Sequence, residues 1–109
     1  SNPKVRENAG KVCIMRGPLV YCIEEVDNGP NLSAITLLGK ELKVESCNDL
    51  PEGVLIITAE GVRSVEHNWD ELYKPYQHTR TKPVAVKAIP YYLWGNRGEG
   101  EMQVWIRAE

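Results

Sequence analysis

The sequence predicts an all-β domain, an antiparallel, jelly-roll-like β-sandwich of about seven to eight strands. Three observations favour this class. Residues typical of turns recur at roughly 8- to 15-residue intervals, and the segments between them are rich in β-branched and aromatic residues. No long amphipathic helical segment occurs, which excludes a fold of parallel strands joined by helical crossovers.

Turns and β-rich segments alternate along the whole chain. Gly17-Pro18, Pro51–Gly53 and Gly95–Gly100 are typical turn sequences. The segments between such turns are the predicted strands: Lys11–Arg16, Leu19–Glu25, Ala34–Leu38, Glu41–Ser46, Val54–Ala59, Val84–Ala88, Tyr91–Trp94 and Glu101–Arg107. Each is short and bounded by turn formers, as strands in sandwiches and barrels are.

The first two predicted strands flank Gly17-Pro18 and are apolar on both faces. Val12–Met15 and Leu19–Ile23 lack a regular polar alternation, and Val54–Ile57 is a continuous apolar run. A strand with two apolar faces is buried on both sides. We therefore expect these strands to be central, or to be covered by something outside the domain.

The last predicted strand, Glu101–Arg107, has the most regular alternation. Met102, Val104 and Ile106 fall on one face, and the residues that follow each of them fall on the other. Because successive side chains of a strand point to opposite faces, this pattern predicts one face in the core and one in contact with solvent or a partner.

The weakest strand pattern lies at Val65–Thr81. We expect a long loop there, with one helical turn capped by Asn68 or Asp70. The two histidines, His67 and His78, fall in this loop, and their spacing matches no metal-ligand pattern. They are interpreted as exposed loop residues.

Composition and charge exclude several functional classes. The 109 residues include 13 Lys plus Arg and 15 Asp plus Glu, so the net charge is −2, and the charges form no long block of one sign. A nucleic-acid partner and an electrostatic membrane partner are therefore not expected. With 42% hydrophobic residues the chain is typical of one globular domain. We assign residues 1–9 to a linker or tag remnant and residues 10–109 to that domain.

The sequence contains no recognisable catalytic or metal motif. Its three cysteines are too few and too scattered for a zinc site or a disulfide scaffold. If Gly17-Pro18 turns a hairpin, Cys13 and Cys22 face each other, which allows a cross-strand disulfide, although small buried residues are the favoured interpretation. The glycine-rich Gly95–Gly100 precedes a predicted strand rather than a helix, so it is not a phosphate site. We expect no enzymatic activity from this domain alone.

Aromatic residues give the remaining functional signal. They crowd the two C-terminal predicted strands and the turn between them: Tyr91, Tyr92, Trp94 and Trp105, with Asn96 and Arg97 at the turn. Three interpretations stay open, namely a protein interface, a filled core and a small glycan site. Arg16 and Arg97 are further candidates, because an arginine can bind a carboxylate or a backbone group of a partner. For Arg16 a partner within the domain is an equal alternative.

Two longer stretches resemble a known family. The first is Gly10–Glu24, which reads GKVCIMRGPLVYCIE, and the second is Ile89–Arg107, which contains WGNRG. Both resemble the C-terminal β-sandwich region of glycoside hydrolase family 127, the β-L-arabinofuranosidase-like enzymes. Together they frame the chain from Gly10 to Arg107, whereas the middle contributes little to the resemblance.

The resemblance implies a non-catalytic role. In that family a helical (α/α)₆ barrel carries the catalytic cysteine, the zinc ligands and the acid/base glutamate, and their motifs are absent here, so zinc is expected only in the catalytic domain. The implied partners are that helical domain of the same chain and, in a homodimer, a second subunit. The alternative is a carbohydrate-binding module that holds an arabinose-containing glycan at Tyr91, Trp94, Asn96 and Arg97. The resemblance also implies a bacterial context, either cytoplasmic or periplasmic.

Overall fold

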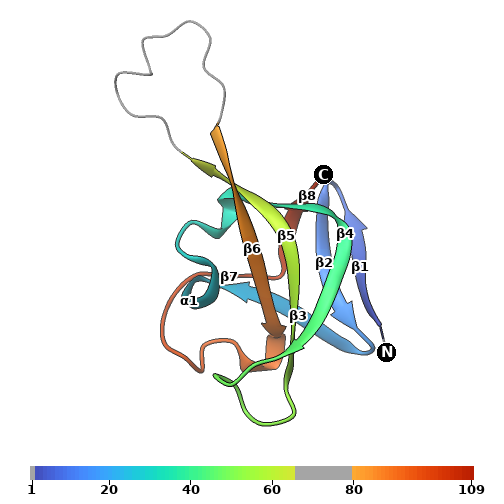
Figure 1. The fold of residues 1–109 in the computed structure, drawn as a ribbon, viewed down its shortest axis with the longest axis vertical. Helices are drawn as coiled ribbons and strands as arrows, with labels where there is room; N and C mark the ends of the chain where they lie inside the picture. The colour runs from blue at the N-terminus through green and yellow to red at the C-terminus, as the bar shows by residue number, and fades with distance from the viewer. Residues whose placement is uncertain (1, 66–79) are drawn as a thin grey trace, which may run out of the picture.

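One mixed sheet organises the computed structural model, which describes residues 2–65 and 80–109 (Figure 1). Its strands are β1 (Pro3–Asn8), β2 (Lys11–Arg16), β3 (Leu19–Glu24), β4 (Ile35–Ser46), β5 (Leu55–Val65), β6 (Arg80–Pro90), β7 (Met102–Gln103) and β8 (Trp105–Ala108). Three short helical segments complete the described part: α1 (Glu25–Asn28) and the 3₁₀ turns η1 (Leu32–Ala34) and η3 (Tyr91–Leu93).

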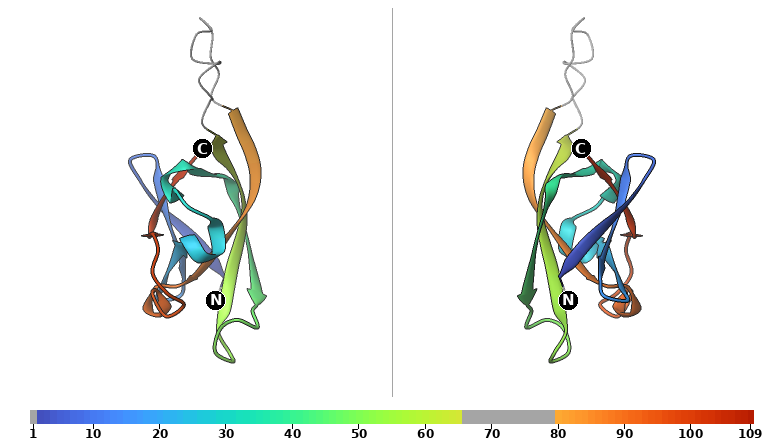
Figure 2. Two further views of the ribbon diagram at one scale, coloured as in Figure 1. Left: turned by 90° about the vertical axis from the view of Figure 1, so that its left-hand side faces the viewer. Right: turned by 90° about the vertical axis from the view of Figure 1, so that its right-hand side faces the viewer.

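The sheet closes into a barrel, so the predicted antiparallel sandwich is wrong. The strand order is β1-β2-β8-β4-β5-β6-β3-β7, and β2 also pairs with β3. This extra pairing joins β2, β8, β4, β5, β6 and β3 into a closed ring, with β1 and β7 added outside it. The β4–β8 pair is parallel, so the sheet is not purely antiparallel. Figure 2 shows the long strands β4, β5 and β6 along one side, and β1, β2 and β8 along the other.

Two local features let the long strands bend into this ring. The register between β4 and β5 shifts between Leu37 and Leu42, a bulge that bends the strand. On β5, Gly61 allows the backbones to approach, because a Cβ there would lie 2.8 Å from the carbonyl oxygen of Thr36. A sandwich leaves strand edges open, whereas closure gives each of the six strands in the ring a partner on both sides.

The hydrophobic residues form two clusters, one on each face of the sheet. The first contains Val12, Ile14, Tyr21, Ile23, Leu32, Ile35, Leu37, Ile57, Val86, Ala88 and Ile106. The second contains Cys22, Ile56, Ile89 and Leu93, packed against Cys47, Leu50, Val54, Met102 and Val104. The prediction that the strands apolar on both faces are central is confirmed, since β5 pairs with two strands and β2 and β3 pair with three each. Both faces of β3 and β5 are covered by residues of the domain itself, since each strand contributes to both hydrophobic clusters.

Several strand predictions are confirmed, with longer strands than expected. β2 matches its predicted bounds, and β3 ends one residue early, at Glu24. The two strands predicted within residues 34–46 are halves of β4, joined across the bulge. β5 and β6 run beyond their predicted ends and pair with each other as far as Val65 and Arg80.

The C-terminal predictions are partly wrong. The expected strand Tyr91–Trp94 is the 3₁₀ turn η3, since β6 ends at Pro90, which has no N–H to continue a ladder. The expected strand Glu101–Arg107 is divided at Val104 into β7 and β8. The three residues predicted to share one apolar face are packed in hydrophobic clusters, but the single face is wrong. Met102 and Val104 pack against the second cluster, whereas Ile106, beyond the break at Val104, lies in the first.

The segment assigned to a linker or tag remnant, residues 1–9, contains strand β1. It pairs along its full length with β2, from Pro3↔Arg16 to Asn8↔Lys11. Ala9 and Gly10, which connect β1 to β2, both have positive φ. Two such residues form the tight hairpin turn whose twist matches that of the flanking strands.

The expected helical turn near Asn68 and the two histidines lie outside the described residues. Within residues 2–65 and 80–109, no helix has the length and apolar character needed to cross a bilayer.

Candidate interaction surface at the aromatic turn

Three large aromatic side chains project from the turn at the end of β6. The exposed fractions of Tyr91, Tyr92 and Trp94 are 44%, 62% and 47%, whereas Leu93 between them is 8% exposed and packs in the second hydrophobic cluster. The N–H of Trp94 donates to the carbonyl oxygen of Tyr91 at 3.1 Å, which closes the 3₁₀ turn. We call Tyr91, Tyr92 and Trp94 the aromatic turn.

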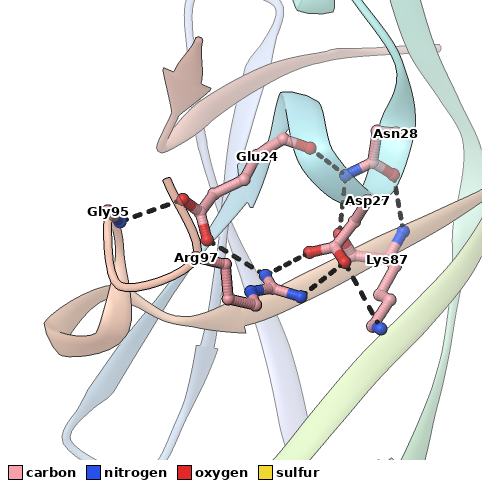
Figure 3. Close-up of polar contacts among 6 residues, drawn as sticks. All are labelled: Glu24, Asp27, Asn28, Lys87, Gly95 and Arg97. Atoms are coloured by element: carbon pink, nitrogen blue, oxygen red, sulfur yellow. Dashed lines mark hydrogen bonds and ion pairs between the residues drawn. The ribbon is translucent and has the colours of Figure 1, made fainter. Parts of the chain in front are cut away.

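A charged cluster holds the chain just after the aromatic turn (Figure 3). The Glu24 carboxylate accepts one hydrogen bond from the Gly95 N–H and one from Arg97 Nη2, both at 3.0 Å. The Asp27 carboxylate accepts two from Arg97, at 2.7 and 2.6 Å, and forms an ion pair with Lys87 Nζ at 3.3 Å. We call Glu24, Asp27, Lys87 and Arg97 the charged cluster.

The charges of this cluster are buried but compensated. The side chains of Glu24 and Asp27 are 6% and 5% exposed, and that of Arg97 is 17% exposed. Hydrogen bonds to Asp27, and then to Glu24, raise the pKa of Arg97 despite burial. Burial lowers the pKa of Lys87, but the Cys47 side chain and Asp27 together raise it by more. Both cations therefore stay charged at neutral pH, opposite two carboxylates.

Asn28 attaches α1 to the neighbouring strand β6. Its Nδ2 donates to the carbonyl oxygens of Glu24 and Lys87 at 3.0 and 2.9 Å, and its Oδ1 accepts the Lys87 N–H at 2.8 Å. The β3–β6 ladder reaches only Ile23↔Ala88, so this side chain continues the pairing by one residue. No local signal in the sequence identifies the partners of Asp27 and Asn28, since Asp27 and Arg97 lie 70 residues apart.

The structure brings some predicted site residues together and separates others. Tyr91, Tyr92 and Trp94 share one turn, whereas Trp105, 39% exposed, lies on β8 opposite Cys13. Asn96 is exposed. Arg97 points to Asp27 and Glu24 within the domain, so its carboxylate partners are internal.

Arg16 lies at the end of β2, and its Nε is buried without an acceptor. Burial raises the pKa of the Tyr21 phenol, and Arg16 lies close enough to lower it in part. Arg16 thus forms part of one end of the barrel, beside Tyr21.

The cysteines do not fit a zinc site. All three are free. The expectation that Cys13 and Cys22 face each other is wrong, because the β2–β3 ladder ends at Met15↔Val20. Beyond it the two strands diverge, and Cys13 pairs with Trp105 of β8 whereas Cys22 pairs with Ile89 of β6. Burial raises the pKa of Cys13, and it raises that of Cys22 to about 12, whereas zinc binds the thiolate. In the part of the chain that the structure describes, no three His, Cys, Asp or Glu side chains are grouped as metal ligands.

Comparison with known proteins identifies relatives along the whole chain. The family profile of the glycoside hydrolase family 127 C-terminal domain matches residues 1–107. The non-reducing end β-L-arabinofuranosidase of Bifidobacterium longum subsp. longum is 39% identical over 113 residues, which cover 98% of this chain and 17% of that protein.

Solved structures of the same family have the same fold. The crystal structure of a family 127 β-L-arabinofuranosidase from Geobacillus stearothermophilus T6 gives a TM-score of 0.85 at 47% identity, over 99% of this chain and 18% of the other. A second β-arabinofuranosidase of the family gives a TM-score of 0.79 at 33% identity, over 99% and 17%. The chain thus spans less than a fifth of the length of these relatives. It belongs to the C-terminal domain family of the glycoside hydrolases of family 127.

Proposed function

We propose that this chain is a non-catalytic domain of an arabinofuranosidase-like glycoside hydrolase and that its aromatic turn docks against the catalytic domain of the same polypeptide. The observation that carries the proposal is the exposure of Tyr91, Tyr92 and Trp94, between 44% and 62%, on one short turn. Tyrosine and tryptophan are enriched at protein interfaces, where a large apolar area is buried with a polar group kept in contact with water.

The turn is held in place from both sides, which favours docking. Leu93 is buried in the second hydrophobic cluster, and the Glu24 carboxylate binds the Gly95 N–H directly after Trp94. A surface that is already ordered loses little conformational entropy when it binds, so more of the contact energy contributes to affinity. The charged cluster thus holds the binding surface in place from within the domain.

The length of the relatives favours a partner on the same polypeptide. More than four fifths of each relative lies outside the matched region. A covalently attached partner is present at an effective concentration of about millimolar or higher when the connecting segment is short. In that setting a modest aromatic surface suffices for stable docking.

A catalytic role for the domain has little support in its chemistry. The two buried carboxylates, Glu24 and Asp27, already bind Arg97, and Asp27 also binds Lys87. Burial keeps the thiols of Cys13 and Cys22 protonated at neutral pH, because it raises the pKa of both. A thiol is a poor nucleophile compared with a thiolate.

The test uses a full-length enzyme that carries this domain. Tyr92→Ser with Trp94→Ser should separate the unfolding of the domain from that of the catalytic part, so that calorimetry records an additional transition at lower temperature. Val44→Ser is the matched control, since Val44 is 37% exposed but lies on β4. Identical calorimetric traces for the double variant and the control would overturn the proposal.

Two further measurements identify other occupants of the surface. Loss of dimers in light scattering, with the calorimetric trace unchanged, would assign the aromatic turn to a contact between subunits. Saturable binding of an arabinose-containing oligosaccharide that Trp94→Ser abolishes would assign it to a glycan. Either result would replace docking against the catalytic domain.

A further inference from the structure

Arg16 and the aromatic turn lie at the same end of the barrel. Arg16 is the last residue of β2 and pairs with Leu19 across the hairpin to β3. Two residues further along β3, Tyr21 pairs with Pro90, which directly precedes Tyr91. In Figure 1 the hairpin between β2 and β3 and the end of β6 both lie at the lower end of the barrel.

Tyr21 connects these two features. Its side chain is 1% exposed, and its hydroxyl donates to the carbonyl oxygen of Leu55 at 2.9 Å. Besides burial, which raises the pKa of Tyr21, both Arg16 and Tyr92 are close enough to affect that pKa. Tyr21 therefore joins the strand that follows the β2–β3 hairpin to the residue that precedes the aromatic turn, through its pairing with Pro90.

The charge of Arg16 is not compensated within the described residues. Arg16 is half-buried and its Nε has no acceptor, and no carboxylate of residues 2–65 and 80–109 forms an ion pair with it. The Nε of Arg97 also lacks an acceptor, but the other nitrogens of that guanidinium bind two carboxylates. A partly buried charge without a counterion is unfavourable, and a partner that supplies one gains affinity.

We infer that Arg16 is the charged anchor of the docking surface and binds a carboxylate from the part of the polypeptide that covers the aromatic turn. This inference rests on the proposed function. Arginine beside tyrosines is the composition of energetically dominant interface positions. A guanidinium binds a carboxylate through two parallel hydrogen bonds, so the partner segment presents an aspartate or a glutamate toward Arg16.

A photo-crosslinking experiment in the full-length enzyme tests both the docking of the aromatic turn and the role of Arg16. Tyr92 is replaced by p-benzoylphenylalanine, the protein is irradiated, and mass spectrometry identifies the crosslinked peptide. The expected product is an intramolecular crosslink to a peptide from outside these 109 residues that contains Asp or Glu. Crosslinks only between subunits, or none, would overturn the proposed function and the inference together.

Variants of Arg16 then test the inference by itself. Arg16→Gln should lower the crosslink yield by about tenfold or more, as expected for the loss of a hydrogen-bonded charge pair. Arg16→Lys should give an intermediate yield, because an ammonium keeps the charge but not the paired geometry. Arg107→Gln on β8, an exposed arginine, is the matched control and should leave the yield unchanged.

The outcomes separate the two claims. An unchanged yield in Arg16→Gln would overturn the role of Arg16 while the docking of the aromatic turn stands. If circular dichroism shows that Arg16→Gln is unfolded, the crosslink yield of Arg16→Lys is the test instead. A wild-type yield in Arg16→Lys would overturn the claim that Arg16 binds the carboxylate through two parallel hydrogen bonds. Exchange of the charges, with Arg16→Asp and the identified acidic residue changed to arginine, should restore the crosslink.

Discussion

Replacement of Arg97 by methionine should strongly destabilise the protein. The substitution removes the guanidinium and keeps most of the aliphatic length, so it isolates the loss of charge and hydrogen bonds. Three hydrogen bonds disappear, two to Asp27 at 2.7 and 2.6 Å and one to Glu24 at 3.0 Å. The two carboxylates stay behind with side chains only 5% and 6% exposed.

The size of the effect follows from what the two carboxylates retain. Removal of one partner of a buried ion pair costs about 3–5 kcal/mol. Asp27 keeps Lys87 at 3.3 Å, but Glu24 keeps only the Gly95 N–H. The loss therefore falls at the lower end, about 3 kcal/mol, which is a large part of the roughly 5–15 kcal/mol that stabilises a typical domain. The melting temperature should fall by about 10–20 °C.

Urea unfolding followed by tryptophan fluorescence measures this loss. Arg107→Met is the control, since Arg107 is exposed on β8 and should change the free energy of unfolding by less than about 0.5 kcal/mol. The double variant Glu24→Gln with Arg97→Met should lose less free energy of unfolding than the sum of the two single variants, because Glu24 then no longer leaves an unpaired buried charge. A loss below about 1 kcal/mol for Arg97→Met would refute the reasoning, since it would place the pair among ordinary surface salt bridges.

Three further predictions concern the barrel and its thiols. Gly61→Ala should lower the free energy of unfolding by about 1–3 kcal/mol, because the added Cβ would lie 2.8 Å from the carbonyl oxygen of Thr36 on β4. Urea unfolding measures the loss, with Ser64→Ala on the same strand as the control. Equal stabilities of the two variants would exclude the close approach. The free energy of unfolding should fall between pH 9 and 12, because burial raises the pKa of Cys22 from 9.0 to about 12 and only the folded state keeps the proton in that range. Cys22→Ala should flatten this dependence in urea titrations, and an unchanged slope contradicts it. Maleimide should label half-buried Cys47 faster than Cys13 and Cys22, which are 5% and 0% exposed. Mass spectrometry of the labelled peptides measures the three rates, and equal rates would contradict the burial of Cys13 and Cys22.

Local patterns in the sequence predict much of the strand content. Continuous apolar runs locate β2 and β3 and place them centrally. The alternation at Met102, Val104 and Ile106 correctly predicts that these side chains are packed, although not that they divide between two clusters. These features depend on the two-residue period of a strand, which is written in consecutive residues. Strand β1 was missed because it is mostly exposed and its pattern is polar.

The aromatic turn shows where local patterns mislead. Aromatic residues favour strands only where a pleated neighbour exists to pack against. β6 ends at Pro90 and the N–H of Gly95 binds the Glu24 side chain, so Tyr91–Leu93 turn instead of pairing. The exposure of three aromatics follows from that turn and could not be read from their type.

The sequence by itself determines most of the strand segments and which residues in them are apolar, since both depend on neighbours along the chain. The tertiary structure alone decides which strands meet. A barrel and a sandwich share the same alternation, and closure here depends on two pairs between β2 and β3 and two between β4 and β8. The partnership of Arg97 with Asp27 is equally nonlocal, because a charge finds its counterion through space, across 70 residues of chain. For that reason Arg97, which the sequence suggested as a contact to an outside partner, instead binds two carboxylates within the domain.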